Sequence, residues 1–493
     1  MSRIDRATFL RRSGGLVAAA AALDWSGTAA ALVGSDPRLR QLAAAVRGPV
    51  LTQSSPGYAV ARVPYNSRYA TIRPLAVVRP LGAGDVSRTI LWARKHSVRL
   101  AARSGGHSYA GYSTTTGVVV DLRNLQGIHV DRGAGTVTVG AGAHLLAVER
   151  TLAAHGLAIP TGSCPTVGVG GLALGGGVGL ASRAWGTTSD NLVEVEIVTA
   201  DGRLRTCNRT HNTELFWGCR GGGGGNFGIA TRFTFRVHPV STVSWFVASW
   251  PWSEAEAVVA AWQTFAPHAP DALFTLCRLA RGVGTPAIEV FGQFIGGESR
   301  LRTLLAPLGH VSGMRLTTGT SSYLDAQLRW AGCLGKTPTA CAAPGHATFA
   351  AKSDYANAPL SAAGIAVLRH RIDQAQAQAW GSASVILDSY GGAINRVKPG
   401  ATAFVHRNAL FSMQELAYWG GSHGPAALAW LRGLHAALRP HVSGFAYQNY
   451  IDPELATWKH AYYGANLPRL VALKRSVDPD GFFRFRQSIP THL

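Results

Sequence analysis

The sequence predicts an α+β protein of two parts, on three observations. Short strand-like runs and amphipathic helical segments are mixed from about residue 71 to residue 241. Longer runs of alternating apolar residues then lie among helical segments between residues 242 and 439. A chain of 493 residues is also too long for one simple core, so we expect two domains or one interrupted domain. Strands and helices that are mixed in this way are typical of the α+β class.

The first part begins with a predicted strand over residues 73–80. A helix over residues 82–98 follows, and Asp85 is its expected N-cap. The other elements expected here are strands over residues 99–106 and 117–142, a helix over residues 144–156, and a hairpin over residues 190–207 that turns at Asp201-Gly202.

The second part has the pattern of an antiparallel sheet flanked by helices. Residues 243–252 and 287–297 alternate as its strands do, and residues 253–267 and 361–378 have the apolar spacing of covering helices. The aromatic-rich remainder from about residue 440 fits either part.

Charge and cysteine content limit the function classes. The net charge of +21 suggests a polyanion partner, but no run of five basic residues occurs, so we expect no nucleic-acid binding. None of the six cysteines forms a Cys-x-x-Cys pair, so no metal site is expected. Cys333 and Cys341 could bridge in an oxidising compartment, whereas Cys207, Cys219 and Cys277 are expected to be buried thiols.

The N-terminus has the layout of an export signal over residues 1–32. Four arginines precede an Ala-rich apolar stretch that is too short and too interrupted to span a membrane. The Arg11-Arg12 pair resembles a twin-arginine signal, although Phe9-Leu10 precedes the pair instead of following it. We therefore expect a secreted or extracytoplasmic protein with no membrane span in the mature chain.

Three glycine clusters lie between Arg103 and Ile229: "RSGGHSYAGYS", "TGSCPTVGVGGLALGGGVG" and "CRGGGGGNFGI". Each alone predicts only a flexible loop. The second has neither the Gly-Lys-Ser/Thr of a phosphate-binding loop nor the context of a dinucleotide fingerprint. Together, the three clusters predict a surface where a large, flat or phosphorylated ligand lies against bare backbone.

The order of these clusters resembles the FAD-linked oxidases of the berberine bridge enzyme type, within the vanillyl-alcohol oxidase superfamily. The tail "YQNYIDPELATWKHAYYGANLPRLVALKRSVDPDGFFRFRQSIP" is similar to the C-terminal module of that family. The resemblance implies a PCMH-type FAD-binding domain over residues 71–241 and a substrate domain over residues 242–439. It also implies that a module over residues 440–493 returns to the FAD domain.

The resemblance further implies that FAD is held by two covalent bonds, from His107 to the 8α-methyl group and from Cys164 to carbon 6. A small valine at Val167 implies access of dioxygen to the flavin, and hence an oxidase that makes hydrogen peroxide. The implied cofactor-binding residues are His107, Cys164, Arg103, Ser104, Gly105, Gly106, Ser108, Tyr109, Val167, Gly168, Gly171, Gly176, Gly177, Gly179, Asn226, Gly228, Ile229 and Asn449.

An alcohol oxidase needs a general base, and the resemblance implies Tyr450 for this role. Residues 445–452 read as a strand that places Gln448 and Tyr450 on one face. Because a phenol titrates near pH ~10, we expect a nearby arginine or lysine to stabilise the phenolate. Asp388 and Tyr390, on one face of a second predicted strand, are the candidates for an assisting group, and Tyr390 is favoured.

The sequence therefore predicts an exported FAD-dependent oxidase that acts on the alcohol group of a sugar or glycosylated natural product. Its partners would be a small-molecule substrate and dioxygen, and Trp245, Trp250, Tyr418 and Trp419 would suit stacking on sugar rings. One alternative is oxidative cyclisation or dehydrogenation of a secondary metabolite on the same fold. A remote alternative is a secreted polyanion-binding protein without enzyme activity.

Overall fold

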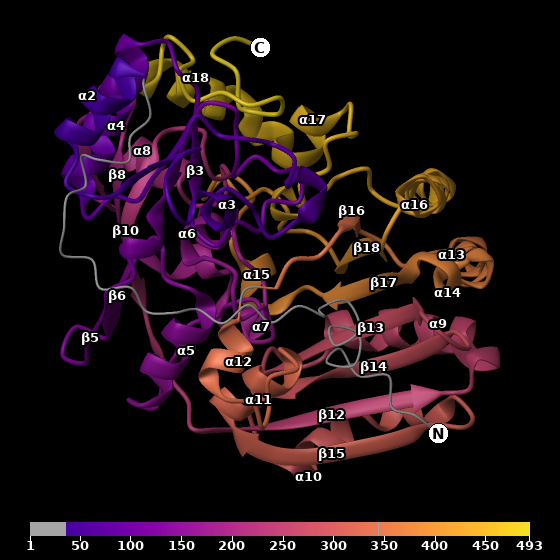
Figure 1. Cartoon of the computed structure of the whole chain (residues 1–493). Coiled ribbons are helices and arrows are strands. Elements are labelled where there is room, and N and C mark those ends of the chain that lie inside the picture. Colours follow the sequence, from indigo (N-terminus) through magenta and orange to yellow (C-terminus); the bar gives the residue numbers. More distant parts are fainter. Residues whose placement is uncertain (1–35, 344) are drawn as a thin grey trace.

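The computed structural model describes residues 36–343 and 345–493. The predicted export signal at residues 1–32 lies outside the described residues. Two larger sheets and a two-stranded pair of β7 (Leu157–Ala158) and β11 (His238–Pro239) lie in the first part of the molecule, in the upper left of Figure 1. The first has the order β1 (Val50–Thr52), β2 (Ala76–Val78), β4 (Val118–Asp121), β3 (Leu100–Arg103). The second has the order β5 (Ile128–Asp131), β6 (Thr136–Gly140), β10 (Ile229–Arg236), β8 (Leu192–Val198), β9 (Leu204–Cys207).

Strand β4 is an inner, fully buried strand of the four-stranded sheet. It pairs in parallel with both β2 and β3, and all four of its residues are buried. A strand covered on both faces needs a continuous apolar run, which Val118–Asp121 supplies with three valines. Strand β1 lies before the predicted start of the FAD domain at residue 71, yet it pairs with β2. Residues 50–52 therefore belong to the same sheet as residues 76–78.

The short helices of this part pack around the two sheets. They are α2 (Pro37–Ala45), α3 (Tyr58–Ala61), α4 (Ala83–Lys95), α5 (Leu145–Ala153), α6 (Val169–Leu174), α7 (Ser182–Trp185) and α8 (Thr213–Gly218). The hairpin predicted at Asp201-Gly202 is confirmed, because β8 and β9 pair antiparallel and Gly202 has the left-handed backbone of a tight turn.

The prediction that Asp85 caps helix α4 is wrong. Gly82 is the N-cap, and Asp85 lies inside the first helical turn. Its carboxylate accepts hydrogen bonds from the backbone N–H groups of Arg47, at 3.0 Å, and Leu81, at 2.9 Å. The side chain therefore ties the segment before the helix to its first turn.

A seven-stranded antiparallel sheet forms the second part, in the lower right of Figure 1. Its order is β15 (Arg315–Ser322), β12 (Thr242–Trp250), β14 (Ala287–Phe294), β13 (Leu273–Arg281), β17 (Gly381–Ser389), β18 (Phe411–Trp419), β16 (Phe349–Ala356). Residues that alternate along β12, such as Phe246 and Trp250, are buried in a core with helical residues, among them Trp262. The helices of this part include α9 (Ala255–Phe265), α10 (Glu298–Leu304), α11 (Tyr323–Trp330), α13 (Ala362–Gln374) and α16 (Gly424–Leu438). The predicted α+β class is confirmed.

The opposite face of the same sheet packs against the first part. Phe274, Ile386 and Leu416 of three neighbouring strands share an apolar cluster with Leu180, which belongs to the second glycine-rich segment. This contact brings the sheet to the glycine clusters.

The C-terminal segment returns to the first part, beside the N-terminal helices at the top of Figure 1. It contains α17 (Trp458–Tyr463) and α18 (Leu467–Val477). Within α18, the buried Lys474 Nζ donates to the backbone oxygens of Asn226 and Phe483, each at 2.6 Å, and pairs with Asp478. One side chain thus joins the last helix to the third glycine cluster.

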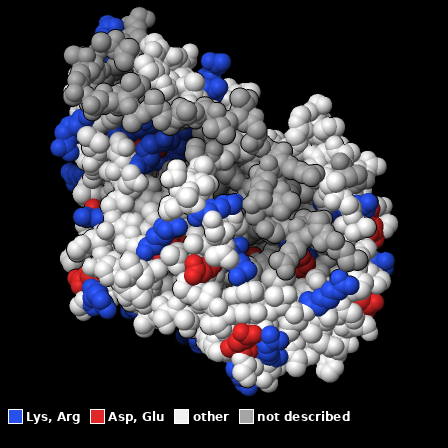
Figure 2. Space-filling model, turned by 60° about the horizontal axis from the view of Figure 1, so that its bottom comes forward, with Lys and Arg blue, Asp and Glu red and all other residues white. Residues whose placement is uncertain are grey.

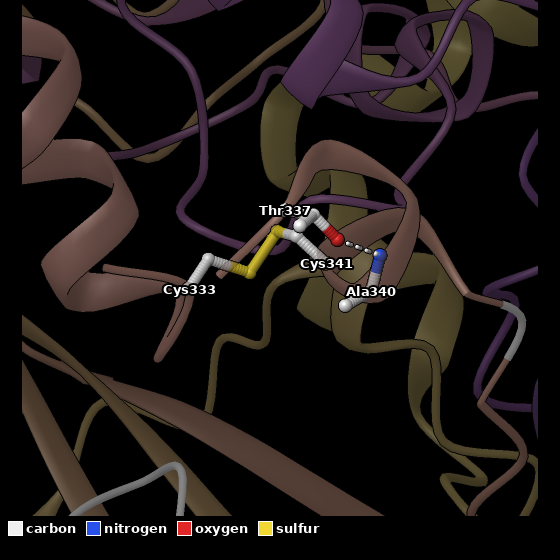
Figure 3. Close-up of a disulfide and its surroundings, with 4 residues drawn as sticks. All are labelled: Cys333, Thr337, Ala340 and Cys341. Atoms are coloured by element: carbon white, nitrogen blue, oxygen red, sulfur yellow. Dashed lines mark hydrogen bonds between the residues drawn. A yellow bond between two sulfur atoms is a disulfide. The ribbon is translucent and has the colours of Figure 1, made fainter. Parts of the chain in front are cut away.

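Cys333 and Cys341 form a disulfide in the loop after α11, as shown in Figure 3. The Thr337 hydroxyl within this loop accepts a hydrogen bond from the Ala340 N–H group at 3.2 Å and caps the short helix α12 (Pro338–Ala342). These are the two cysteines that the sequence analysis considered able to bridge. They are eight positions apart in the sequence.

The surface is basic without a continuous basic face in the view of Figure 2, where Lys and Arg are spread among uncharged residues with Asp and Glu between them. Some arginines are paired with carboxylates, as Arg469 is with Glu214 at 2.6 Å. The absence of nucleic-acid binding stays a prediction. Among the described residues, no helix combines the length and apolar character needed to cross a membrane.

Candidate active site

A cavity of about 640 Å³ lies between the three glycine clusters, the C-terminal segment and the seven-stranded sheet. Its volume falls within the range of about 300–1,000 Å³ that is usual for cofactor and ligand sites. The first cluster contributes Ser104 to Tyr109, the second includes Cys164 and Gly171, and the third includes Asn226. Segments that are far apart in the sequence therefore form one continuous wall.

His107 lies four residues after the end of strand β3 and lines this cavity. Its ring stacks on Tyr65 with centroids 3.8 Å apart, and its Nε2 lies 3.0 Å from Oγ1 of Thr166. Burial, followed by the nearby His144, lowers the pKa of His107 to about 3. The imidazole is therefore neutral at physiological pH, which is the form that can act as a nucleophile.

Cys164 is the exposed member of the four cysteines outside the disulfide, and it also lines the cavity. Cys207, Cys219 and Cys277 are buried, which confirms the expectation for these three thiols. Burial raises the pKa of Cys207 to about 12, so that thiol stays protonated. Cys164 is thus the thiol that the fold presents to a ligand.

The glycines have two different roles. A Cβ atom on Gly105 would lie 2.3 Å from the backbone nitrogen of Gly168, so the first and second clusters pack backbone to backbone. A Cβ atom on Gly175 would lie 1.9 Å from Oδ1 of Asn449. Gly171 differs, because a Cβ atom there would meet nothing within 4 Å and its position lines the cavity. Close chain packing therefore explains more of these glycines than direct contact with a ligand does.

Most of the predicted cofactor residues line the cavity: Ser104, Gly105, Gly106, His107, Ser108, Tyr109, Cys164, Val167, Gly168, Gly171, Gly179, Asn226, Gly228, Ile229 and Asn449. The structure places Arg103, Gly176 and Gly177 outside this lining. The Arg103 guanidinium instead donates to the backbone oxygens of Ser113 and Arg62, each at 3.0 Å. Gly176 and Gly177 have positive φ angles and approach Phe404 and Thr188, respectively.

Buried polar atoms along the cavity test whether the site suits FAD. The hydroxyls of Ser113 and Thr114 and the Oε1 atom of Gln448 are buried without a hydrogen-bond partner among the described residues. All three residues line the cavity. Unsatisfied buried polar groups are rare in native proteins, so these atoms are expected to bind a polar ligand or water. The cavity therefore fits a ligand that is polar along part of its length, as FAD is.

The segment with Tyr450 is not the predicted strand. Gln448–Tyr450 form a 3₁₀ turn, in which the Tyr450 N–H group bonds to the Tyr447 carbonyl at 2.9 Å. The turn lets two successive side chains contact the second glycine cluster: Gln448 Nε2 donates to Gly175 O and Asn449 Nδ2 donates to Leu172 O. A strand would send these two amides to opposite faces.

Tyr450 lies in the cavity wall, stacked on Tyr109 with ring centroids 5.5 Å apart. The Tyr109 hydroxyl accepts a hydrogen bond from Gln414 Nε2 at 2.9 Å. Burial first, and then the Asp388 carboxylate, raise the pKa of Tyr450 well above its usual value. The charge that acts most strongly on this phenol is therefore negative, in contrast to the expected arginine or lysine.

The two candidate assisting groups differ in position. Asp388 belongs to strand β17 and lines the cavity, and its carboxylate accepts from the Ser412 hydroxyl at 3.4 Å. Tyr390 follows the end of that strand and is fully buried outside the lining, with its hydroxyl 3.3 Å from that of Tyr355. The placement thus favours Asp388 over Tyr390.

Sequence reasoning missed several residues of the cavity wall. Phe274, Leu276 and Gln414 line it from two strands of the sheet, and Arg484 and Arg486 line it from the C-terminal segment. The strand residues alternate as any two-faced strand does, so the pattern alone could not tell which face meets a ligand. The "FFRFR" run lies in the tail that resembles the C-terminal module of the family. Its two alternating arginines, Arg484 and Arg486, are the sequence signal that could have indicated this part of the wall.

Comparisons with known proteins decide the family. The FAD binding domain model matches residues 74–208, and the "Berberine and berberine like" model matches residues 446–490. An uncharacterised FAD-linked oxidoreductase of Bacillus subtilis, YgaK, is 36% identical over 458 residues, covering 90% of this chain and 97% of that protein. The chain belongs to the berberine bridge enzyme-like family. It is therefore an FAD-linked oxidoreductase, which excludes the alternative of a polyanion-binding protein without enzyme activity.

Solved structures of this family share the fold. Wild-type BBE-like 1 of Physcomitrella patens aligns with a TM-score of 0.84 at 32% identity, covering 92% of this chain and 99% of that one. A chitooligosaccharide oxidase aligns with a TM-score of 0.81 at 27% identity, covering 91% of this chain and 98% of that one. Carbohydrate oxidases are thus among the structural neighbours of this family member.

Two variants of the grass pollen allergen Phl p 4 bear on the reaction with dioxygen. Each is 29% identical to this chain, covers 90% of it over 96% of its own length, and aligns with a TM-score of 0.81 or 0.80. They differ by one isoleucine-to-valine substitution. The variant with valine is described as a glucose oxidase, and the other is described as a glucose dehydrogenase.

Proposed function

We propose that this family member is an FAD-dependent oxidase of alcohol groups, with FAD bound covalently to His107 and Cys164. The observation that supports the proposal best is that one cavity is lined by His107, Cys164, Asp388 and Tyr450. The two tethering side chains, the proton acceptor and its partner come from four separate segments. A protein that only binds a ligand would not need these four side chains in one cavity.

His107 and Cys164 suit covalent attachment for different reasons. The lowered pKa of His107 keeps its imidazole neutral and nucleophilic. Cys164 is exposed to the cavity, whereas burial holds the other thiols in their protonated form. A tether at two points would also keep the cofactor from being lost outside the cell.

Asp388 is the proposed proton acceptor, and Tyr450 is its proposed partner at the substrate hydroxyl. When bound, FAD supplies an acceptor for the hydride of the alcohol carbon and passes the electrons to dioxygen, which leaves as hydrogen peroxide. The hydroxyl proton must go to the protein. Because the pKa of Tyr450 is raised, its phenol keeps its own proton at neutral pH, and the Asp388 carboxylate is the group that can take the substrate proton. Tyr450 would then hold the substrate hydroxyl or relay its proton.

Val167 is the proposed point of dioxygen access. It lines the cavity three residues after Cys164, and the Phl p 4 variants link a valine to oxidase activity in a related protein. Export of the enzyme is also proposed. The Cys333–Cys341 disulfide supports it, because such bridges persist in oxidising compartments.

The test is the absorbance spectrum of the purified enzyme, followed by peroxide release on a panel of alcohols. We expect the two-band spectrum of oxidised flavin, and one molecule of peroxide for each alcohol oxidised to a carbonyl. Protein that contains no flavin would refute the proposal. A product with a new ring or double bond would favour the alternative of oxidative cyclisation or dehydrogenation instead.

A further inference from the structure

We infer that the buried hydroxyl groups of Ser412, Tyr390 and Tyr355 form a one-way chain of hydrogen bonds that ends at Asp388 and keeps this carboxylate ionised beside the cavity. The three are positioning residues, because they act through Asp388 and lie outside the lining of the cavity. The inference rests on the proposed function, in which Asp388 takes the proton of the alcohol. It also gives a role to Tyr390, which the sequence suggested as an assisting group.

The register of the seven-stranded sheet places three of these residues in one row. Asp388 of β17 pairs directly with Ser412 of β18, and Ser412 pairs directly with Tyr355 of β16. Side chains directly opposite one another in an antiparallel sheet lie on the same face. Leu276, which pairs with Asp388 from the other side, lines the cavity, as Asp388 does. The row therefore lies on the face of the sheet that meets the cavity.

Tyr390 links the members of this row from just beyond the end of β17. Its backbone N–H group donates to the Leu410 carbonyl at 2.8 Å. Its hydroxyl lies 3.3 Å from that of Tyr355 and also hydrogen-bonds with Ser412. The Ser412 hydroxyl in turn donates to Oδ2 of Asp388 at 3.4 Å. Three hydroxyl groups from three segments thus connect in series to one carboxylate.

The direction of the chain follows from the number of protons, since each hydroxyl has only one to donate. The proton of Ser412 goes to the Asp388 carboxylate, so Ser412 must accept from Tyr390, and Tyr390 must accept from Tyr355. Burial raises the pKa of both phenols well above the ordinary value, so both keep the protons that they donate. Every bond of the chain therefore points toward Asp388.

The chain is sealed from water. Tyr390 is fully buried, and the exposed fractions of Tyr355 and Ser412 are 1% and 2%. Burying a hydroxyl costs free energy unless it is bonded, so phenylalanine would serve as well at both tyrosine positions if packing alone mattered. Hydrogen bonds to a charged group are stronger than neutral ones, and bonds in series polarise one another. The three hydroxyls together therefore favour the ionised form of Asp388.

Three phenols face Asp388 among the described residues. Tyr447 and Tyr450 face it from the turn over residues 447–450, and Tyr390 faces it from beyond its own strand. Burial, with the Asp388 carboxylate adding to it, raises the pKa of each of these phenols. None of them changes charge while a carboxyl group titrates, so the titration of Asp388 can be followed without a coupled phenol.

The titration of Asp388 in the intact holoenzyme tests the chain. The infrared band of its protonated carboxyl group is obtained as the difference between each protein and the same protein with Asp388→Asn. Both printed distances are long for hydroxyl groups, so we expect modest shifts. Ser412→Ala, which removes the direct bond, should move the midpoint upward by about one pH unit. Tyr390→Phe should move it in the same direction by less, and Tyr355→Phe by least.

Two further variants are the controls. Ser412→Thr keeps the hydroxyl and should stay close to the wild-type midpoint. Tyr323→Phe removes a buried phenol of α11 that is not part of the chain, and it should leave the midpoint unchanged. The melting temperature and the flavin spectrum report whether each variant is folded. A midpoint that moves for Ser412→Ala but not for Tyr390→Phe would overturn the chain, as would an equal shift in Tyr323→Phe.

Failure of this inference can be told apart from failure of the proposed function. If the midpoint stays fixed in all chain variants while Asp388→Asn loses turnover, the chain is wrong and the proposed role of Asp388 stands. If Asp388→Asn keeps its turnover, both are wrong.

Discussion

The Lys352 Nζ atom lies 2.7 Å from Oδ2 of Asp452, and both side chains are buried. Lys352 belongs to β16, the edge strand of the seven-stranded sheet, and Asp452 lies two residues after Tyr450. The next residue of the strand, Ser353, accepts from the Tyr447 N–H group at 3.0 Å. The segment that bears Tyr450 is therefore held along the outer edge of the sheet by successive side chains.

Replacing Lys352 with methionine should loosen this segment. The change leaves the buried Asp452 carboxylate without its cation, and we expect a loss of about 3–5 kcal/mol in the free energy of unfolding, with a fall in kcat. Thermal melts and steady-state kinetics measure the two effects. Lys459→Met, on an exposed part of α17, is the control. The double variant Lys352→Met with Asp452→Asn should recover most of the stability, and no recovery would contradict the role of the ion pair.

The proton acceptor Asp388 and its partner Tyr450 should respond differently to substitution. Asp388→Asn should lower turnover about a hundredfold or more, because it removes the proposed proton acceptor. It should also lower the pKa of Tyr450, which the carboxylate raises. Tyr450→Phe should lower turnover while the protein keeps its yellow colour. A pH–rate profile of each variant measures these effects, and Asp388→Asn with undiminished kcat would exclude the proposed role.

Covalent attachment of FAD predicts a distinct pattern in denatured protein. The wild type should carry the mass of FAD after unfolding, and Cys164→Ala or His107→Ala should each keep flavin through the remaining bond. The double variant should release all of its flavin. Gel fluorescence under ultraviolet light and intact mass spectrometry detect the bond. Cys277→Ala, in the seven-stranded sheet, is the control, and loss of attachment in this variant would point to unfolding instead.

Stability should depend on pH through Asp354. Burial raises the pKa of Asp354 to about 6, against an ordinary value of 3.8. Because the folded state holds this proton more tightly than the unfolded state does, the stabilising contribution is complete below pH 3.8 and is lost as pH rises through about 6. We expect the wild type to lose on the order of 3 kcal/mol across that window relative to Asp354→Asn. Chemical denaturation across this range, with Asp480→Asn as the exposed control, measures the difference.

The sequence predicted what local patterns determine. Alternation identified the antiparallel strands β12 and β14, and the glycine clusters with His107 and Cys164 identified one wall of the cavity. It failed where long-range contacts override the local pattern. Residues 447–450 alternate like a strand but turn, because Gln448 and Asn449 both bond to a segment more than 270 residues earlier. The sheet residues of the cavity wall could not be predicted for the same reason, since no local pattern says which face of a strand meets the cavity.

The lining of the cavity also sets an order of events during synthesis. It extends from Ile72 to Arg486, so its C-terminal wall, residues 447–451, 463 and 483–486, is translated after all the others. A nascent chain that ends before residue 447 would lack Tyr450 and the amides that brace the second glycine cluster. A cofactor in this cavity can therefore be enclosed only once residues 447–486 have been translated. Cofactor loading should accordingly wait until the chain has emerged from the ribosome as far as Arg486.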